Sequence, residues 1–370
     1  MSDKDGKIDY GMFIMPFHDP EKPLVQCYDE DLELITIAEQ LGYKEFWIGE
    51  HHTMKYENIV MPEIFIARAL GETSTIRLGP APICVNQHHP AHVASRLAFL
   101  DHLSKGRLNL CLGPGSVSAD MELYGAHPKD ASKMTIEAID AIVKLWTTDP
   151  PYEHNGEFWQ FKLEKNVSPE AQLGYIHKPL QQPHPPISMP GSSMNSSTMK
   201  QCGARGYQPF CHCIIPGNVV ANTWQTYEQA ALEAGHKPKR SDWRVARSIL
   251  VCDTTKEAVD RARTNSMGRK YEYIGMLMDQ GIGHRNILKR DKNMSDSDCN
   301  LDYFMSEQMI VGDVDEVVRR LLALVEEGGT FGTLAVMGYD WDDRESWVHS
   351  MELFANEVMP ALNNAVGCVT

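Results

Sequence analysis

The chain has 370 residues, with 35 Lys and Arg against 50 Asp and Glu, which gives a formal net charge of −15. Such an acidic chain repels phosphate backbones and anionic lipid, so neither nucleic acid nor a membrane surface is an expected partner. No run approaches the ~18–20 apolar residues of a membrane span, and residues 1–7 are too polar for a secretory signal. We therefore expect a cytoplasmic protein with a short frayed N-terminal tail.

The first half of the chain alternates short apolar runs with amphipathic helical segments. Strands are expected at residues 8–15, 45–49, 76–84 and 107–112. Helices are expected at residues 29–41, 62–72, 90–103 and 130–146. A stretch rich in Pro, Asn and His follows at residues 148–186 and is too long for a plain connection. We interpret it as an excursion within one domain, because the alternation resumes after it.

The second half continues the same pattern. Strands are expected at residues 187–189, 207–213, 243–252 and 333–337. Helices are expected at residues 194–204, 219–235, 255–267, 314–327 and 345–359. Residues 269–307 show no regular period and are expected to be irregular. Successive strand–helix units imply a parallel sheet.

The strand count and the length together predict a single α/β domain over residues 1–370, a (β/α)8 TIM barrel with insertions after strands 4 and 7. A doubly wound open sheet is the structural alternative. That fold usually carries a glycine-rich turn directly after its first strand. Here the first strand is followed by Pro16, Phe17 and His18, with no glycine.

Ionisable side chains follow the second predicted strand, at the end where barrel enzymes place their sites. Glu50, His51 and His52 come directly after an apolar run that contains Trp47. They could serve catalysis, or they could form a hydrogen-bonded structural cluster. A metal site would need other histidines, at positions 88, 89 and 92, to converge on the same point, which spacing cannot show. We predict no metal.

The ends of the next strands carry residues suited to a ligand. Ala81-Pro82 could form a cis bond at the floor of a pocket, although most X–Pro bonds are trans. Glycine after the fourth strand would let a ligand approach the backbone. A dense run of hydroxyl and amide side chains after the fifth strand could cradle a phosphate at a helix N-terminus or simply cap that helix. The candidates at these two strand ends are Gly115, Ser116, Asn195, Ser196, Ser197 and Thr198.

The nine cysteines are odd in number and scattered, which is typical of reduced thiols rather than of a disulfide scaffold. Cys211-His212-Cys213 is the one Cys/His cluster in the sequence. It has no second ligand pair at the spacing of a zinc site, so buried apolar thiols are the favoured interpretation.

Several short motifs in order resemble those of the bacterial luciferase-like flavin-dependent monooxygenases. Over nearly the whole chain, these are residues 46–52 (FWIGEHH), 76–79 (IRLG) with 89–90 (HP), 103–107 (LSKGR), 122–125 (ELYG), 203–207 (GARGY), 311–313 (VGD) and 354–360 (FANEVMP). Each motif is weak alone, but the ordered set is specific. The runs at 47–51 and 195–197 look most like the limonene and diketocamphane monooxygenase branch.

The resemblance implies a two-component reaction. A separate flavin reductase would supply reduced FMN (FMNH2), O2 would add to it to give a C4a-(hydro)peroxyflavin, and a small apolar organic substrate would be oxygenated. His51 would act as acid or base, with Glu50 and His52 as its partners. Ala81-Pro82 would be cis under the flavin ring. Gly115, Ser116 and the residues 195–198 would lie on the phosphate side, and a homodimer is expected.

Two features of the sequence bear on that implied site. Pro114 stands where luciferases place an arginine near the phosphate, so either another basic residue (Arg77, Lys200 or Arg205) replaces it or flavin binds more weakly. Residues 269–307 correspond to the family's mobile lid. Its apolar side chains could line a substrate pocket, or the segment could be a disordered surface loop. These side chains are Met276, Leu277, Met278, Ile282 and Ile287.

Three alternatives to the oxygenase stay open. The same barrel family includes deazaflavin (F420)-dependent oxidoreductases, which the 50–52 run disfavours. A non-catalytic flavin-binding protein and, more remotely, a metal-dependent hydrolase are the others. The sequence does not distinguish oxygen insertion into a ketone from epoxidation or hydroxylation, because these depend on the shape of the pocket.

Overall fold

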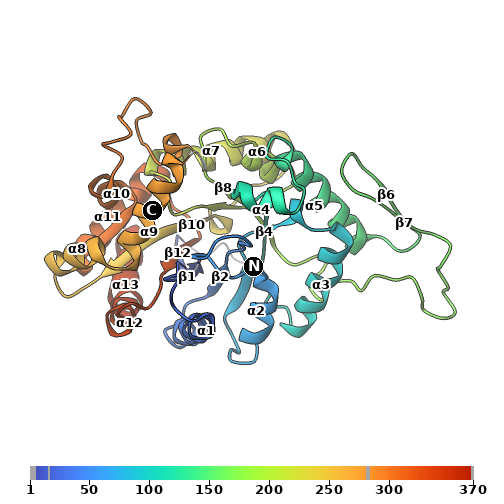
Figure 1. Cartoon of the computed structure of the whole chain (residues 1–370), viewed down its shortest axis with the longest axis horizontal. Helices are drawn as coiled ribbons and strands as arrows, with labels where there is room; N and C mark the ends of the chain where they lie inside the picture. The colour runs from blue at the N-terminus through green and yellow to red at the C-terminus, as the bar shows by residue number, and fades with distance from the viewer. Residues whose placement is uncertain (1–5, 16, 281–283, 368–370) are drawn as a thin grey trace.

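A computed structural model of the chain describes residues 6–15, 17–280 and 284–367. Of the features predicted above, most of the N-terminal tail, Pro16 and Ile282 lie outside the described residues. Strands surrounded by helices form the body of the molecule (Figure 1). The strands are β1 (Asp9–Ile14), β2 (Glu45–Ile48), β3 (Arg77–Pro80), β4 (Ile83–Cys84), β5 (Leu110–Gly113), β8 (Ile187–Gly191), β9 (Gln208–Cys211), β10 (Arg244–Val251), β11 (Met309–Gly312) and β12 (Thr333–Gly338).

These strands are all parallel, and all except β11, which lies off the ring and pairs with β10, form a closed ring. The sheet runs β3-β2-β1-β12-β10-β9-β8-β5-β4. A parallel bridge between Leu78 and Leu108 joins β3 to the segment leading into β5, so the two edges of the sheet meet. Strands β3 and β4 are two pieces of the third predicted strand, interrupted at the cis Ala81–Pro82 bond. The predicted TIM barrel is confirmed.

Helices cover the outside of the ring. They are α1 (Leu24–Gln40), α2 (Pro62–Ala69), α3 (Pro90–Leu103), α4 (Ser118–Leu123), α5 (Ala131–Thr147), α6 (Ser197–Ala204), α7 (Gly217–Glu233), α8 (Thr255–Thr264), α9 (Ser266–Asp279), α10 (Leu301–Glu307), α11 (Val314–Gly328), α12 (Arg344–Leu353) and α13 (Met359–Gly367). Within residues 6–15, 17–280 and 284–367, every helix is too short or too polar to cross a lipid bilayer.

Helix α11 shows how the sequence specifies these helices. The Asp313 side chain caps its first turn by accepting a hydrogen bond from the Glu316 N–H. Val317, Leu321 and Leu324 recur at helical spacing and are buried against the barrel. The helix ends before Gly329, whose φ of 81° suits a residue without a side chain.

An ion pair fills the end of the barrel where the strands begin. The guanidinium of Arg244 on β10 lies 2.6 Å from the Glu45 carboxylate on β2 and over the ring of Trp47. Burial raises the pKa of Glu45, but the neighbouring Arg244 outweighs it and holds that pKa below its usual range. Because side chains fill this end, a ligand has to enter from the opposite end, where the strands finish.

The predicted irregular segment at residues 269–307 begins and ends in helices, so that prediction was wrong at both ends, whereas residues 288–300 are irregular as predicted. Helix α9 runs to Asp279, and α10 covers Leu301–Glu307. Asn265 caps α9 by accepting from the backbone N–H groups of Met267 and Gly268. Two glycines and a buried lysine hide the helical period of α9 in the sequence. Strand β11, which pairs with β10, was not predicted at all.

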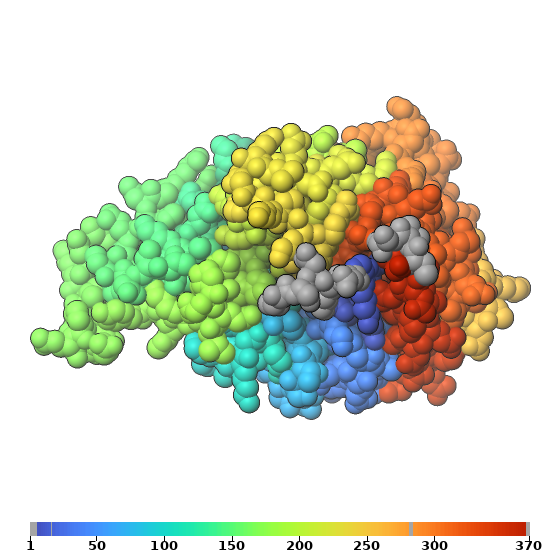
Figure 2. Space-filling view, turned by 180° about the vertical axis from the view of Figure 1, so that it is seen from behind, coloured from blue at the N-terminus to red at the C-terminus, as the bar shows by residue number. Residues whose placement is uncertain are grey.

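The excursion at residues 148–186 contains an antiparallel hairpin of β6 (Tyr152–Asn155) and β7 (Gln160–Leu163). It projects from the side of the barrel beyond α3 and α5 (Figure 1), and in the rear view it forms the green extension on the left (Figure 2). The Glu137 carboxylate on α5 holds the turn of the hairpin by accepting backbone N–H bonds from residues 157–159. The hairpin is therefore an ordered addition to the barrel.

Candidate active site

His51 follows β2 at the open end of the barrel and lies between two carboxylates. Its Nε2 is 2.9 Å from Glu57 and its Nδ1 is 3.5 Å from Asp120. Burial lowers the pKa of His51, but Glu57 and Asp120 outweigh burial and raise it to about 9. The imidazole therefore carries a proton over the physiological range.

The two carboxylates have partners of their own. The Asp120 carboxylate on α4 also accepts the Thr53 backbone N–H at 2.7 Å. Glu57 faces the ammonium of Lys270 on α9 at 3.3 Å, and that ammonium also donates to the Met15 carbonyl at 3.1 Å. Burial opposes ionisation of both acids, yet Lys270 and His51 lower the pKa of Glu57 to about 2, and His51 and Thr53 do the same for Asp120.

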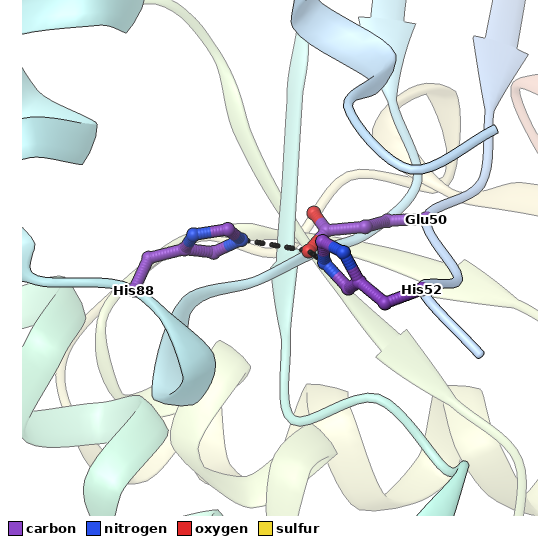
Figure 3. A group of neighbouring side chains, drawn as sticks. All are labelled: Glu50, His52 and His88. Carbon is purple, nitrogen blue, oxygen red and sulfur yellow. Dashed lines mark hydrogen bonds and ion pairs between the residues drawn. The ribbon is translucent and has the colours of Figure 1, made fainter. Parts of the chain in front are cut away.

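Glu50 and His52 belong to a second cluster, which His88 completes (Figure 3). One oxygen of the Glu50 carboxylate accepts from His52 at 2.9 Å and from His88 at 2.7 Å. The other accepts the Cys84 backbone N–H at 3.3 Å. Burial raises the pKa of Glu50, but the two imidazoles lower it further than burial raises it.

The second cluster has the donor set of a divalent metal site. Among the described residues, the ligand atoms of Glu50, His52 and His88 lie within 4.8 Å of one another. Of the three histidines considered for convergence, His88 converges, whereas His89 caps α3 and contacts the β6–β7 hairpin. Hydrogen bonds already satisfy the Glu50 carboxylate. The expectation of no metal stays a prediction, which metal analysis of the purified protein tests.

The bond predicted to be cis, Ala81–Pro82, is cis and lies at the ends of β3 and β4. Next to it, Gly113 ends β5, and a side chain there would meet Pro190 at 2.7 Å. Gly115 has a φ of 68°, and a Cβ atom on it would meet the Cys84 sulfur at 2.7 Å. Neighbouring protein atoms therefore already occupy the place of a side chain at both positions, so only glycine fits there.

The predicted phosphate residues lie around the start of α6. The Ser196 hydroxyl accepts the Met199 N–H, so this residue caps the helix. Asn195 has a φ of 53° and its N–H donates to the Asn222 side chain at 2.6 Å. Ser197 and Thr198 open the helix, and Ser197 lines a crevice of about 420 Å³ that also contains Lys133. Ser116 is exposed after β5.

Two of the three basic residues considered as replacements for the missing arginine are engaged elsewhere. Arg77 begins β3 at the opposite end of the barrel and binds the Asn109 side chain at 2.8 Å, so that suggestion was wrong. Arg205 follows α6 and pairs with Asp140 at 2.8 Å. Lys200 lines a groove between α6 and α7. Lys133, which the sequence did not suggest, lines the same crevice as Ser197, together with the carboxylates of Glu137, Asp140 and Glu157.

Buried amide groups without partners lie near Gly115. On the turn after β4, neither amide atom of Asn86 has a hydrogen-bond partner in the structure, and neither does Oε1 of Gln87. The Gln87 side chain approaches Gly115, with Nε2 3.4 Å from where a Cβ would lie. Buried polar atoms are normally paired. The unpaired amide atoms on this turn therefore suit a polar ligand such as a flavin.

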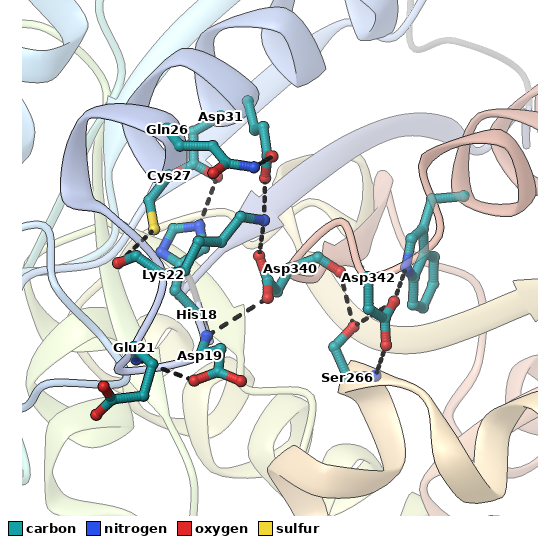
Figure 4. Close-up of polar contacts among 12 residues, drawn as sticks. His18, Asp19, Glu21, Lys22, Gln26, Cys27, Asp31, Ser266, Asp340 and Asp342 are labelled. Carbon is teal, nitrogen blue, oxygen red and sulfur yellow. Dashed lines mark hydrogen bonds and ion pairs between the residues drawn. The ribbon is translucent and has the colours of Figure 1, made fainter.

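Polar contacts fix the first turn of α9 at the mouth of the barrel (Figure 4). The Ser266 backbone N–H donates to Asp342 at 2.6 Å, and its hydroxyl donates to the Asp340 carbonyl at 2.8 Å. The Asp340 carboxylate in turn lies 2.7 Å from Lys22, in the loop before α1. Helix α9 is thus tied to the loops that follow β1 and β12.

The predicted lid residues are only partly placed as expected. Met276 is 45% exposed and faces an outer recess of about 420 Å³, lined by Phe17, Tyr56 and Tyr273. The inner face of α9 instead presents Lys270, Tyr271 and Ile274, which are buried. Leu277, Met278 and Ile287 are half-buried.

The eight described cysteines are free and buried, as predicted. Cys211 accepts from the Trp243 indole N–H at 3.1 Å. Between Cys211 and Cys213, the His212 ring contacts the Met15 sulfur at 3.2 Å, and burial lowers its pKa to about 4. His212 is therefore a neutral neighbour of the His51 group.

Sequence comparison identifies the family. The sequence model described as luciferase-like monooxygenase matches residues 8–330. The chain belongs to this family. It is 33% identical to 4-hydroxyprotoasukamycin monooxygenase of Streptomyces nodosus subsp. asukaensis, over 98% of this chain and 95% of the relative. It is 28% identical to limonene 1,2-monooxygenase of Rhodococcus erythropolis, over 99% and 90% of the two chains. The predicted branch is confirmed.

Solved structures give the same result. The oxygenating constituent of 3,6-diketocamphane monooxygenase from Pseudomonas putida, a type II Baeyer–Villiger monooxygenase in complex with FMN, superimposes with a TM-score of 0.85. That match has 28% identity and covers 96% of this chain and 98% of the other. An F420-dependent secondary alcohol dehydrogenase shares the fold, with a TM-score of 0.71 at 20% identity.

Proposed function

We propose that this protein is the oxygenase component of a two-component flavin-dependent monooxygenase. It would use reduced FMN from a separate flavin reductase, together with O2, to oxygenate a small apolar organic compound. The observation that carries the proposal is the full-length likeness to an FMN-bound oxygenase, joined to the unpaired buried amide atoms of Asn86 and Gln87 on the turn after β4. Reduced flavin, when bound, supplies the electrons that activate O2.

The residues of this chain have separate tasks in that function. The unpaired amide atoms of Asn86 and Gln87 would meet the polar edge of the ring system, and Gly113 and Gly115 let the turns around them pack closely. Ser197 and Thr198, at the start of α6, would hold the phosphate. His51 holds a proton next to the reacting atoms and could donate it or take it back. Helix α9 limits the access of water to the mouth.

In this proposal the protein acts in the cytoplasm as a single-domain chain that forms a homodimer. The reduced state of its thiols supports that location. Helices α2 and α3 contact each other and expose Ile64, Phe99 and Leu103, which are 68%, 63% and 48% accessible. Large apolar side chains on neighbouring helices favour an interface between two copies.

The test supplies reduced FMN from an external reductase and measures O2 uptake, H2O2 release and product for terpenes, cyclic ketones and thioethers. With at least one substrate class, we expect the O2 that is consumed to appear in an oxygenated product instead of as released H2O2. A variant His51→Gln should lose this coupling, whereas His349→Gln, on the exposed face of α12, should keep it. If reduced F420 but not FMN titrates the protein, the deazaflavin alternative holds. If flavin binds without accelerated O2 uptake, the protein is only a flavin binder.

A further inference from the structure

Four buried charged groups meet at the mouth of the barrel from three different elements. His51 and Glu57 lie in the loop after β2, Asp120 on α4 and Lys270 on α9. Their exposed fractions are 7%, 5%, 2% and 2%, so water screens none of them well. We call this set the charge quartet.

The contacts within the charge quartet alternate in sign. Lys270 meets Glu57 at 3.3 Å, Glu57 meets His51 at 2.9 Å, and His51 meets Asp120 at 3.5 Å. With a protonated imidazole, the quartet has two positive and two negative groups and no net charge. With a neutral imidazole it would have a net charge of −1, and an unbalanced buried charge is costly.

The remaining neighbours do not change this balance. His212 approaches from the end of β9 and is neutral, because burial lowers its pKa to about 4. The Glu50 carboxylate and its two imidazoles form their own hydrogen-bonded cluster. Thr53 and the Met15 carbonyl contribute uncharged hydrogen-bonding groups. Lys270 and protonated His51 therefore both pair with the Glu57 carboxylate, and the positive charge of Lys270 disfavours the proton on His51.

We propose that Lys270 and Glu57 are positioning residues that set the protonation state of His51 through the charge balance of the quartet. The ammonium that fixes α9 over the barrel thereby also limits how strongly the imidazole holds its proton. The link from this protonation state to oxygenation rests on the proposed function, but the charge balance itself does not.

The proposal predicts opposite effects for two substitutions. Lys270→Met removes a positive charge and leaves the quartet at −1, so His51 should hold its proton to higher pH. Glu57→Gln removes a negative charge and leaves it at +1, so His51 should lose its proton at lower pH. Each shift should be about 1–3 pH units, as for charges at this range in proteins. The double variant is neutral again and should titrate close to the unmodified protein.

The experiment follows the His51 ring by NMR in full-length protein with isotope-labelled histidine, between pH 5 and 11. His51→Gln assigns the resonance by its loss. Lys270→Arg keeps the charge and should titrate like the unmodified protein. Lys289→Met removes another buried lysine, which pairs with Asp296 rather than Glu57, and should leave the His51 titration unchanged.

Shifts of opposite sign with recovery in the double variant support the proposal. Shifts of equal sign, or none in the folded variants, overturn it. Circular dichroism identifies any variant that does not fold. If Lys270→Met does not fold, the comparison of Glu57→Gln with Lys270→Arg still tests the direction in which the His51 titration shifts. Because the NMR measurement needs no flavin, a protein that titrates as predicted but oxygenates nothing would refute the proposed function alone.

Discussion

Replacing Arg244 by Met should destabilise the barrel far more than the loss of an ordinary ion pair. The substitution removes the guanidinium that lies 2.6 Å from Glu45 and leaves a buried carboxylate, which also accepts the Trp47 indole N–H. Breaking a buried pair on one side costs about 3–5 kcal/mol. The pair of Arg319 with Glu316 has the same chemistry on the surface, where Arg319 is 68% exposed, and its loss should cost about 0–1 kcal/mol.

Urea unfolding followed by circular dichroism measures both effects as changes in the free energy of unfolding. Glu45→Gln combined with Arg244→Met should recover part of the loss, because no buried charge is left. The loss in Arg244→Met should also shrink as the pH falls, beginning above the ordinary range of a carboxyl, because burial without Arg244 raises the pKa of Glu45. An equal effect of Arg244→Met and Arg319→Met at neutral pH would refute the reasoning.

Three further predictions concern the site and the assembly. Because the folded-state pKa of His51 is raised to about 9, its stabilisation should be complete below about pH 6.5 and lost as the pH rises through 9. The gap in unfolding free energy between the protein and His51→Gln should narrow over that window, and a constant gap would contradict the assignment. Gly115→Ala should weaken FMN binding at least tenfold in a fluorescence titration, since its φ of 68° and the Cys84 sulfur leave no room for Cβ; Gly125→Ala, with an equally positive φ but open space, is the control. Phe99→Asp should give monomers in analytical ultracentrifugation, and an unchanged sedimentation coefficient would place any interface elsewhere.

The barrel and the histidine motif could be predicted from the sequence because both depend on local patterns. Short apolar runs between amphipathic helices define the strands, and a strand end determines where Glu50, His51 and His52 lie. The partners of these residues could not be predicted in the same way. Glu57, Asp120 and Lys270 are ordinary surface residue types in the sequence, and only the closure of the ring brings their elements together.

The misassigned segments have physical reasons too. Helix α9 buries a lysine and carries glycines at positions 268 and 275, so its apolar face is incomplete in the sequence. Strand β11 has only the residues Met309–Gly312 and gains its stability from pairing with β10. The surroundings of the start of α6 could not be predicted either. Lys133 on α5 lines the same crevice as Ser197 only because the fold brings α5 beside α6.

The way α9 is fastened sets the direction in which the barrel can open. Its first turn is held by the hydrogen bonds of Ser266 and by the buried ammonium of Lys270, whereas its last turn is held by the contact of Arg285 with the exposed Asp279. Breaking exposed contacts costs less than separating buried ones. A passage for reactants would therefore form beside Met276, with the start of the helix acting as the pivot, and His51 would stay shielded throughout each opening.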